Sequence, residues 1–302
     1  MLGNNKNQIE GQNQIASFLN FPRKILFWEL FLFCLILGLG ISAAFFLNQQ
    51  KAEQLPISQI SFWDFLLGFS LATLFILFVS RLFRRSRKKG AIYKFLFIFI
   101  SWWAGGILLS VWLPDLLALS LMGILVFWRW KSPTMLNHNL CMVLGLAGVG
   151  SSLGIALQPK IVVALLIFFS IYDWISVCKT KHMQKMAREM AAEGAILALI
   201  VPQKFSDFKQ SLGGVKPGGK FLILGGGDVV FPLLLCASLV PVGILNSLIV
   251  AIFSLIGLSV SFWIFASQPL AFQKKGGGRQ PIPALPPIAL FSIIGFLISS
   301  VI

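Results

Sequence analysis

Long apolar runs are the feature that most restricts what this chain of 302 residues can fold into. A helix needs roughly 20 apolar residues to cross a bilayer. Nine runs approach or exceed that length, and they cover approximately residues 25–47, 61–80, 92–113, 115–130, 138–157, 160–178, 221–242, 244–267 and 283–302. Only 12% of the residues are charged, which lies outside the usual composition of soluble domains. The sequence therefore predicts an all-α polytopic membrane protein with nine transmembrane helices.

The basic residues indicate how these helices are oriented. With nine spans, 23 of the 25 Lys and Arg residues fall on the side of the N-terminus, and only Lys51 and Lys160 fall on the other. Lys and Arg accumulate in the cytoplasmic loops of membrane proteins. We therefore expect a multi-pass protein of the cell membrane with the N-terminus in the cytoplasm and the C-terminus outside. Residues 1–24 would form a polar cytoplasmic tail, residues 25–302 a single membrane domain, and residues 179–220 a cytoplasmic loop.

The net charge of +15 has a simple interpretation in this arrangement. Basic loops next to a membrane attract anionic lipid headgroups, and no soluble domain accompanies them as in nucleic-acid-binding proteins. We expect the lipid bilayer, and not a nucleic acid, as the partner of these charges. The four cysteines lie singly in four apolar runs, and the two histidines, His138 and His182, lie near the ends of runs. Neither pattern indicates a metal site, and no cofactor is expected.

Two carboxylates lie deep in apolar runs, where ionisable residues are costly and typical of functional sites. Asp173 lies six residues before Lys179, and Asp228 lies eight residues after Lys220 on the same predicted face. At 1.5 Å of rise per helical residue these offsets are about 9 and 12 Å, so the two carboxylates are predicted to share a level in the membrane. Asp64 lies only three residues into its run, where its side chain can reach the interface.

Two carboxylic acids in contact cannot both ionise cheaply, so they share one proton and titrate as a unit. The ionised member can then activate a water molecule while the neutral member protonates a carbonyl or a leaving amine. This is the arrangement of an aspartic protease. The sequence has no His-Glu-x-x-His motif for an intramembrane zinc protease. Asp173 and Asp228 are therefore candidates for such a pair.

Glycines and prolines flank this predicted pair. Gly225, Gly226 and Gly227 precede Asp228 directly. Each weakens a helix by about 1 kcal/mol relative to alanine, and together they let another backbone approach the carboxylate. Prolines at 281, 283, 286 and 287 disrupt the start of the last run and favour extended backbone. Both segments are expected to border an aqueous site that admits an unwound substrate, whereas Gly150 and Gly154 are interpreted as close helix packing.

Three motifs together resemble one known family. Tyr172-Asp173, Gly225-Gly226-Gly227-Asp228 and Pro283-Ala284-Leu285 are similar to the YD, GxGD and PAL motifs of the presenilin and signal peptide peptidase family of intramembrane aspartyl proteases. Their order and the nine-helix frame agree, so the resemblance covers most of the chain. It implies that Asp173 and Asp228 are catalytic, on helices at about 160–178 and 221–242. It also implies that Pro283, Ala284 and Leu285, at the start of the last helix (281–287), line the site, and we expect Tyr172 and the three glycines to shape it.

The resemblance also carries expectations about partners. The compact length resembles prokaryotic members, which implies activity without an obligatory accessory subunit. The 42-residue loop 179–220 is much shorter than the eukaryotic one, so we expect no obligatory self-cleavage. Substrates would be single-span transmembrane proteins or signal-peptide-like helices. A cytoplasmic N-terminus is the presenilin orientation, and it predicts a preference for substrates whose own N-terminus faces outward.

Two other functions remain compatible with the residues. A prepilin-peptidase-like aspartyl protease also uses a Gly-x-Gly-Asp motif and a second aspartate, although it would not require the proline motif of the last run. A non-enzymatic transporter or leak could relay protons or ions through the same carboxylates. The triple glycine and the prolines favour a peptide backbone over an ion as the ligand.

Overall fold

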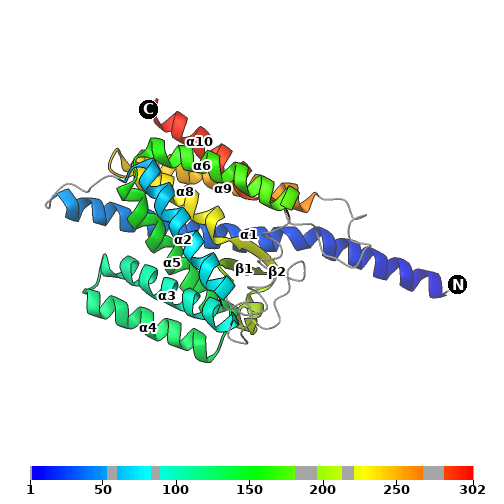
Figure 1. Ribbon diagram of the computed structural model, residues 1–302. Coiled ribbons are helices and arrows are strands. Elements are labelled where there is room, and N and C mark those ends of the chain that lie inside the picture. The colour runs from blue at the N-terminus through cyan, green and yellow to red at the C-terminus, as the bar shows by residue number, and fades with distance from the viewer. Residues whose placement is uncertain are drawn as a thin grey trace.

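The computed structural model describes residues 2–52, 60–82, 89–180, 196–212, 221–267 and 282–301. Nine α-helices lie within these ranges: α1 (Leu2–Ala52), α2 (Phe62–Leu82), α3 (Lys89–Ser110), α4 (Asp115–Lys131), α5 (Met135–Ala156), α6 (Pro159–Ile175), α8 (Gly226–Leu239), α9 (Ile244–Ala266) and α10 (Leu285–Ser299). Two short strands, β1 (Ala198–Pro202) and β2 (Phe221–Gly225), lie between α6 and α8 in the sequence. The helices form one bundle, with the two chain termini at opposite ends (Figure 1).

The helices are apolar enough to place the protein in a membrane. Within the described residues, four segments have the length and composition to cross a bilayer: Arg23–Gln50, Met135–Ala156, Pro159–Cys178 and Ile244–Ala266. Shorter apolar helices cover Phe62–Phe75, Lys94–Ser110, Gly226–Leu239 and Leu285–Ser299. Because the bundle is apolar on its outside as well as in its core, the chain is a membrane-embedded helical protein.

Helices α5 and α8 form the centre of the bundle. Almost every residue of α8 from Val229 onward is buried, and glycines on α5 let it approach closely. A Cβ on Gly154 would lie 2.9 Å from the Leu234 carbonyl oxygen and 2.5 Å from the Ala237 Cβ, and a Cβ on Gly150 would collide with Leu233. The interpretation of Gly150 and Gly154 as packing residues is thereby confirmed.

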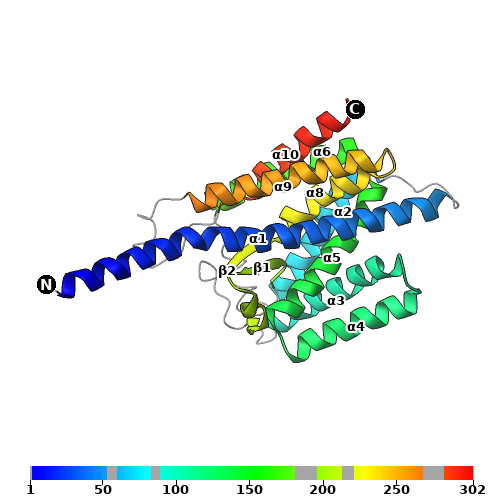
Figure 2. The ribbon, with the colours of Figure 1, turned by 180° about the vertical axis from the view of Figure 1, so that it is seen from behind.

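Helices α9 and α10 pack in the same way, at the side of the bundle that also holds α6 (Figure 2). A Cβ on Gly257 would lie 2.8 Å from the Ile288 Cα, and one on Gly295 would lie 2.8 Å from the Phe253 Cβ. Ser254 and Ser292 share a buried hydrogen bond of 2.7 Å between these two helices. Close packing and a polar contact therefore hold the last helix against the bundle.

The seventh apolar run is not one helix. Residues Phe221–Gly225 form β2, which pairs with β1 in antiparallel register from Ala198↔Gly225 to Pro202↔Phe221, and α8 begins only at Gly226. The predicted helix over 221–242 is therefore wrong at its start. Glycines make a helix costly at this point, and pairing with β1 satisfies backbone groups of the segment instead.

The two-stranded sheet lies at the end of the bundle from which the N-terminal part of α1 projects (Figure 1). Strand β1 is wholly buried, with Leu199, Ile200 and Val201 at 0% exposure. The segment 179–220, predicted as a loop, thus contributes a buried strand where the structure describes it, and residues 181–195 and 213–220 lie outside the described residues. The sheet leads directly into α8, and so it places the start of that helix.

Candidate active site

Asp173 lies near the end of α6, where the helix passes into a π-helical turn at Ser176–Thr180. Its side chain is buried, with 6% exposure. The carboxylate oxygen Oδ2 accepts a hydrogen bond of 3.3 Å from the backbone amide of Leu285, the first residue of α10. The first amides of a helix have no partner within the helix, so Asp173 caps α10 from another part of the chain.

Asp228 is the third residue of α8 and is partly buried. Its carboxylate accepts a hydrogen bond from the backbone amide of Gly225, the residue that caps the helix. A Cβ on Gly225 would lie 2.9 Å from Asp228 Oδ2. The absence of a side chain at Gly225 thus gives the carboxylate room to fold back over the helix start.

The structure brings the two aspartates together. Asp173 and Asp228 lie on helices that pack against each other, and their carboxylates are close enough to interact electrostatically. Phe169 on α6 and Phe231 on α8 stack with ring centroids 4.4 Å apart. Phe169 lies one turn from Asp173, and Phe231 lies one turn from Asp228, so this ring pair sets the spacing of the helices next to the carboxylates.

The Pro283–Leu285 segment borders the same place. Residues 282–284 precede α10 without regular secondary structure, Pro283 and Ala284 are half-buried, and Leu285 is buried at 3% exposure. The Leu285 amide is the donor to Asp173. The structure therefore brings this segment to one of the two carboxylates, while Pro281 lies outside the described residues.

The other predicted site residues lie differently. Tyr172 is 56% exposed on the outside of α6, although its neighbour Asp173 is buried. Gly227 is exposed at the start of α8. A Cβ on Gly226 would lie 3.1 Å from both the Leu146 Cδ2 and the Leu197 carbonyl oxygen, so packing against α5 and β1 accounts for this glycine. Of the three glycines, Gly225 is the one next to the Asp228 carboxylate. Tyr172 takes no part in the contacts described above.

A third buried carboxylate was not predicted. Glu29 on α1 is only 3% exposed, its Oε2 has no hydrogen-bond partner among the described residues, and it lies within electrostatic range of Asp228. It lies six residues after Arg23, near the start of the apolar run 25–47. The signal that could have found it is a carboxylate inside the apolar run 25–47. No group of three or more His, Cys, Asp or Glu residues suited to a metal lies in the described part of the chain.

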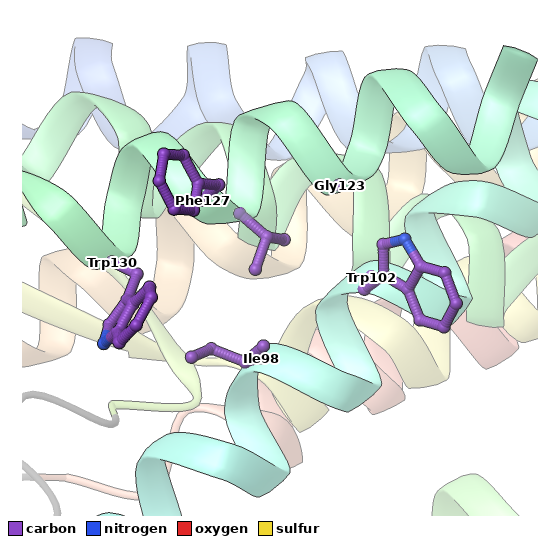
Figure 3. Close-up of a pocket in the computed structure, with 6 residues that line it drawn as sticks. Ile98, Trp102, Gly123, Phe127 and Trp130 are labelled. Carbon is purple, nitrogen blue, oxygen red and sulfur yellow. The ribbon is translucent and has the colours of Figure 1, made fainter.

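An apolar pocket lies apart from the aspartates, between α3 and α4 (Figure 3). Its volume is about 250 Å³, and it is lined by Ile98, Trp102, Gly123, Val126, Phe127 and Trp130. The Trp102 indole nitrogen donates a hydrogen bond of 3.0 Å to the Leu119 carbonyl. Because this pocket offers no ionisable group, it supplies no chemistry of its own.

Comparisons with known proteins agree with this geometry. The sequence matches the family model described as "Signal-peptide peptidase, presenilin aspartyl protease" over residues 28–302. Two solved structures, each described as a presenilin family intramembrane aspartate protease, share the fold. The one in space group C222 has a TM-score of 0.56 and 24% identity, and the match covers 94% of this chain and 99% of that one. The one in space group P2 has a TM-score of 0.52 and 23% identity, with coverage of 89% and 96%. No curated protein matches the chain.

Proposed function

Because the chain belongs to the signal-peptide peptidase and presenilin family of aspartyl proteases, we propose that it hydrolyses peptide bonds of transmembrane helices with Asp173 and Asp228 as its catalytic pair. The observation that carries the proposal is the proximity of these two carboxylates on adjacent helices. Each is the acid of a family motif, and each lies in an apolar segment where a carboxylate without a function is costly.

The chemistry follows from a proton shared by the pair. The ionised carboxylate would take a proton from water as that water attacks the scissile carbonyl carbon, and the neutral carboxylate would donate its proton to the carbonyl oxygen. Collapse of the tetrahedral intermediate would return a proton to the leaving amine. No metal or organic cofactor is required for these steps.

The backbone amides of Leu285 and Gly225 would orient the two acids. Each amide is held at the start of a helix and donates to one carboxylate, Leu285 to Asp173 and Gly225 to Asp228. A carboxylate with one oxygen held by a fixed donor keeps its other oxygen available for water or for the substrate. Preorganised donors of this kind reduce the reorganisation needed during the reaction.

The substrate helix must unwind, because hydrogen bonds within a helix shield its peptide bonds. An unwound segment needs new partners for its backbone groups inside the membrane. Among the described residues, strand β2 pairs with β1 on one side only, and it ends next to Asp228, so its other edge could accept an extended segment. The exposed Gly227 and the half-buried Pro283 and Ala284 would border that segment.

We also propose the nine-span topology with a cytoplasmic N-terminus, and with it activity in the cell membrane without an accessory subunit. The distribution of basic residues, 23 on one side against two on the other, supports this orientation. The positions of the termini at opposite ends of the bundle fit an odd number of spans (Figure 1). Substrates would be single-span or signal-peptide-like helices in the same membrane.

Incubation of the purified protein in liposomes with a labelled transmembrane peptide tests the proposal. Cleavage should disappear separately in Asp173→Asn and Asp228→Asn, and persistent cleavage in either variant would refute the catalytic pair. Proton or cation flux lost in both variants, without any proteolysis by the wild type, would instead support the leak. Cleavage only of peptides with a prepilin-type leader would support the prepilin-peptidase alternative.

A further inference from the structure

Side chains of α5 cover the outer edge of β1. The Asn139 side-chain amide donates to the Ile200 carbonyl at 2.7 Å and accepts from the Ile200 amide at 3.0 Å. The neighbouring His138 places Nε2 2.9 Å from the Ala198 carbonyl. Alternate residues of a strand direct their backbone groups to the same edge, so Ala198 and Ile200 present theirs together. Asn139 thus makes the pair of hydrogen bonds that a residue of a neighbouring strand would make.

These bonds lie in the interior of the bundle. Asn139 is 3% exposed, and His138 and Ile200 are fully buried. A buried backbone group left without a partner costs roughly 1–3 kcal/mol, and Asn139 satisfies two such groups on one residue. A shift of β1 by one residue would turn these groups toward the opposite edge. The two side chains therefore fix β1 along α5 in a single register.

Arg129 on α4 fixes the orientation of the His138 ring. Its Nε and Nη2 atoms lie 3.3 and 3.1 Å from His138 Nδ1. A guanidinium group has donors only, so Nδ1 accepts and Nε2 carries the hydrogen that is donated to Ala198. The guanidinium carbon lies 3.8 Å from the centroid of the Phe97 ring on α3, and that ring also stacks on His138. Three helices thus support one hydrogen bond to β1.

Strand β1 in turn fixes the start of α8. Ala198 pairs with Gly225, and the Gly226 amide donates a 3.1 Å hydrogen bond to the Leu197 carbonyl. Gly226 is also tightly packed, since a Cβ there would lie 3.1 Å from both the Leu197 carbonyl oxygen and Leu146 of α5. Because Asp228 lies two residues further along the chain, any displacement of β1 would move its backbone.

We propose that Asn139 and His138 are positioning residues, which hold β1 against α5 and thereby place the Asp228 carboxylate for catalysis. The inference rests on the proposed function, because it assigns a purpose to the position of Asp228. Neither residue would contact the substrate, so their loss would affect the chemical step more than binding. We expect kcat to fall about tenfold or more and KM to change less than about threefold, since misplacement by about 1 Å can cost two orders of magnitude.

The experiment uses the full-length protein in liposomes and compares variants of similar size. Asn139→Leu removes both hydrogen bonds to Ile200, Asn139→Asp removes only the donor, and His138→Gln retains a donor for Ala198. The matched control is Asn137→Leu, because Asn137 is also a buried asparagine of α5, but it bonds Thr134 and Ser132 at the helix start. The measurements are kcat, KM and the masses of the products, all at a temperature where each variant is folded.

The inference predicts lower kcat and less uniform cleavage positions in both Asn139 variants, near-wild-type values in His138→Gln, and wild-type values in Asn137→Leu. Equal losses of kcat in the Asn139 variants and in Asn137→Leu would indicate a structural role only and would overturn it. If Asn139→Leu does not fold, Asn139→Asp and His138→Gln still make the comparison.

Amide hydrogen exchange tests the anchoring without reference to activity. Asn139→Leu should accelerate exchange in segments 198–202 and 222–226, whereas Asn137→Leu should not. Unchanged exchange in Asn139→Leu would overturn the inference even in a protein that cleaves peptides. Failure of the proposed function would give a different result. Asp173→Asn and Asp228→Asn would then leave cleavage unaffected, while the effect of Asn139→Leu on hydrogen exchange could still be observed.

Discussion

The Asp173 carboxylate accepts a hydrogen bond from the backbone amide of Leu285, which lies 112 residues further along the chain. One side chain thus takes part in the candidate active site and also caps the last helix. A carboxylate that serves only as an acid could be replaced without loss of stability. Here the two roles can be separated by the choice of substitution.

Asp173→Asn and Asp173→Ala should differ in stability although both abolish cleavage. The asparagine side-chain oxygen can still accept from Leu285, whereas alanine leaves the amide without this partner. Loss of a cap costs about 0.5–2 kcal/mol, so only the alanine variant should unfold more easily. Thermal unfolding of both variants in the same detergent measures the difference. Equal stability of the two would mean that the bond contributes nothing to the fold.

Gly225→Ala should impair catalysis because the added Cβ would lie 2.9 Å from Asp228 Oδ2. The carboxylate would have to turn away from its position, and we expect kcat to fall by about tenfold or more. Gly38→Ala is the control, since nothing lies within 4 Å of a Cβ at that glycine. The idea would fail if the kinetics of Gly225→Ala matched those of the control.

Gly154→Val should destabilise the protein, because Leu234 and Ala237 of α8 fill the space that the side chain would need. Overpacking of a close interface costs about 1–3 kcal/mol. Gly38→Val introduces the same side chain into open space on α1, so it reports the intrinsic cost in a helix. Unfolding in denaturant compares the two, and a similar stability would contradict the close approach of α5 and α8.

Glu29→Leu should stabilise the protein. The Glu29 Oε2 is buried without a hydrogen-bond partner among the described residues, and an uncompensated polar group costs roughly 1–3 kcal/mol. Glu29→Gln keeps a polar group of the same size and should bring no such gain. A thermal shift assay decides, and a loss of stability in the leucine variant would show that the carboxyl group makes a favourable interaction after all.

The proposed orientation of the chain predicts a directional preference. Substrate helices whose N-terminus faces outward should be cleaved faster than the same helices inserted in reverse. Peptides with different tags at the two ends, reconstituted in both directions, provide the measurement. Equal cleavage of the two orientations would remove this preference from the proposal.

The helices could be predicted from sequence because long apolar runs leave the chain few alternatives in a membrane. The proximity of Asp173 and Asp228 could be anticipated as well, since both lie at similar offsets from basic residues on one predicted face. The described structure brings the two carboxylates within electrostatic range. These features depend on composition and on distances along single helices, which the sequence shows directly.

The sheet could not be predicted in the same way. Residues Phe221–Gly225 form a strand only because Ala198–Pro202 pairs with them, and that partner is held by His138 and Asn139 on α5. A short apolar run fits a strand as well as a helix, so periodicity does not decide between them.

The stacked rings of Phe169 and Phe231 have a consequence for inhibitor design. Their centroids are 4.4 Å apart, which is already contact distance for stacked aromatic rings, so α6 and α8 cannot approach each other more closely at this level. A compound that bridges the two carboxylates must therefore fit a separation of α6 and α8 that the contact between these rings prevents from becoming smaller. Rigid scaffolds with a fixed separation between their two hydroxyl or amine groups should suit this gap better than flexible chains, which would lose conformational freedom on binding.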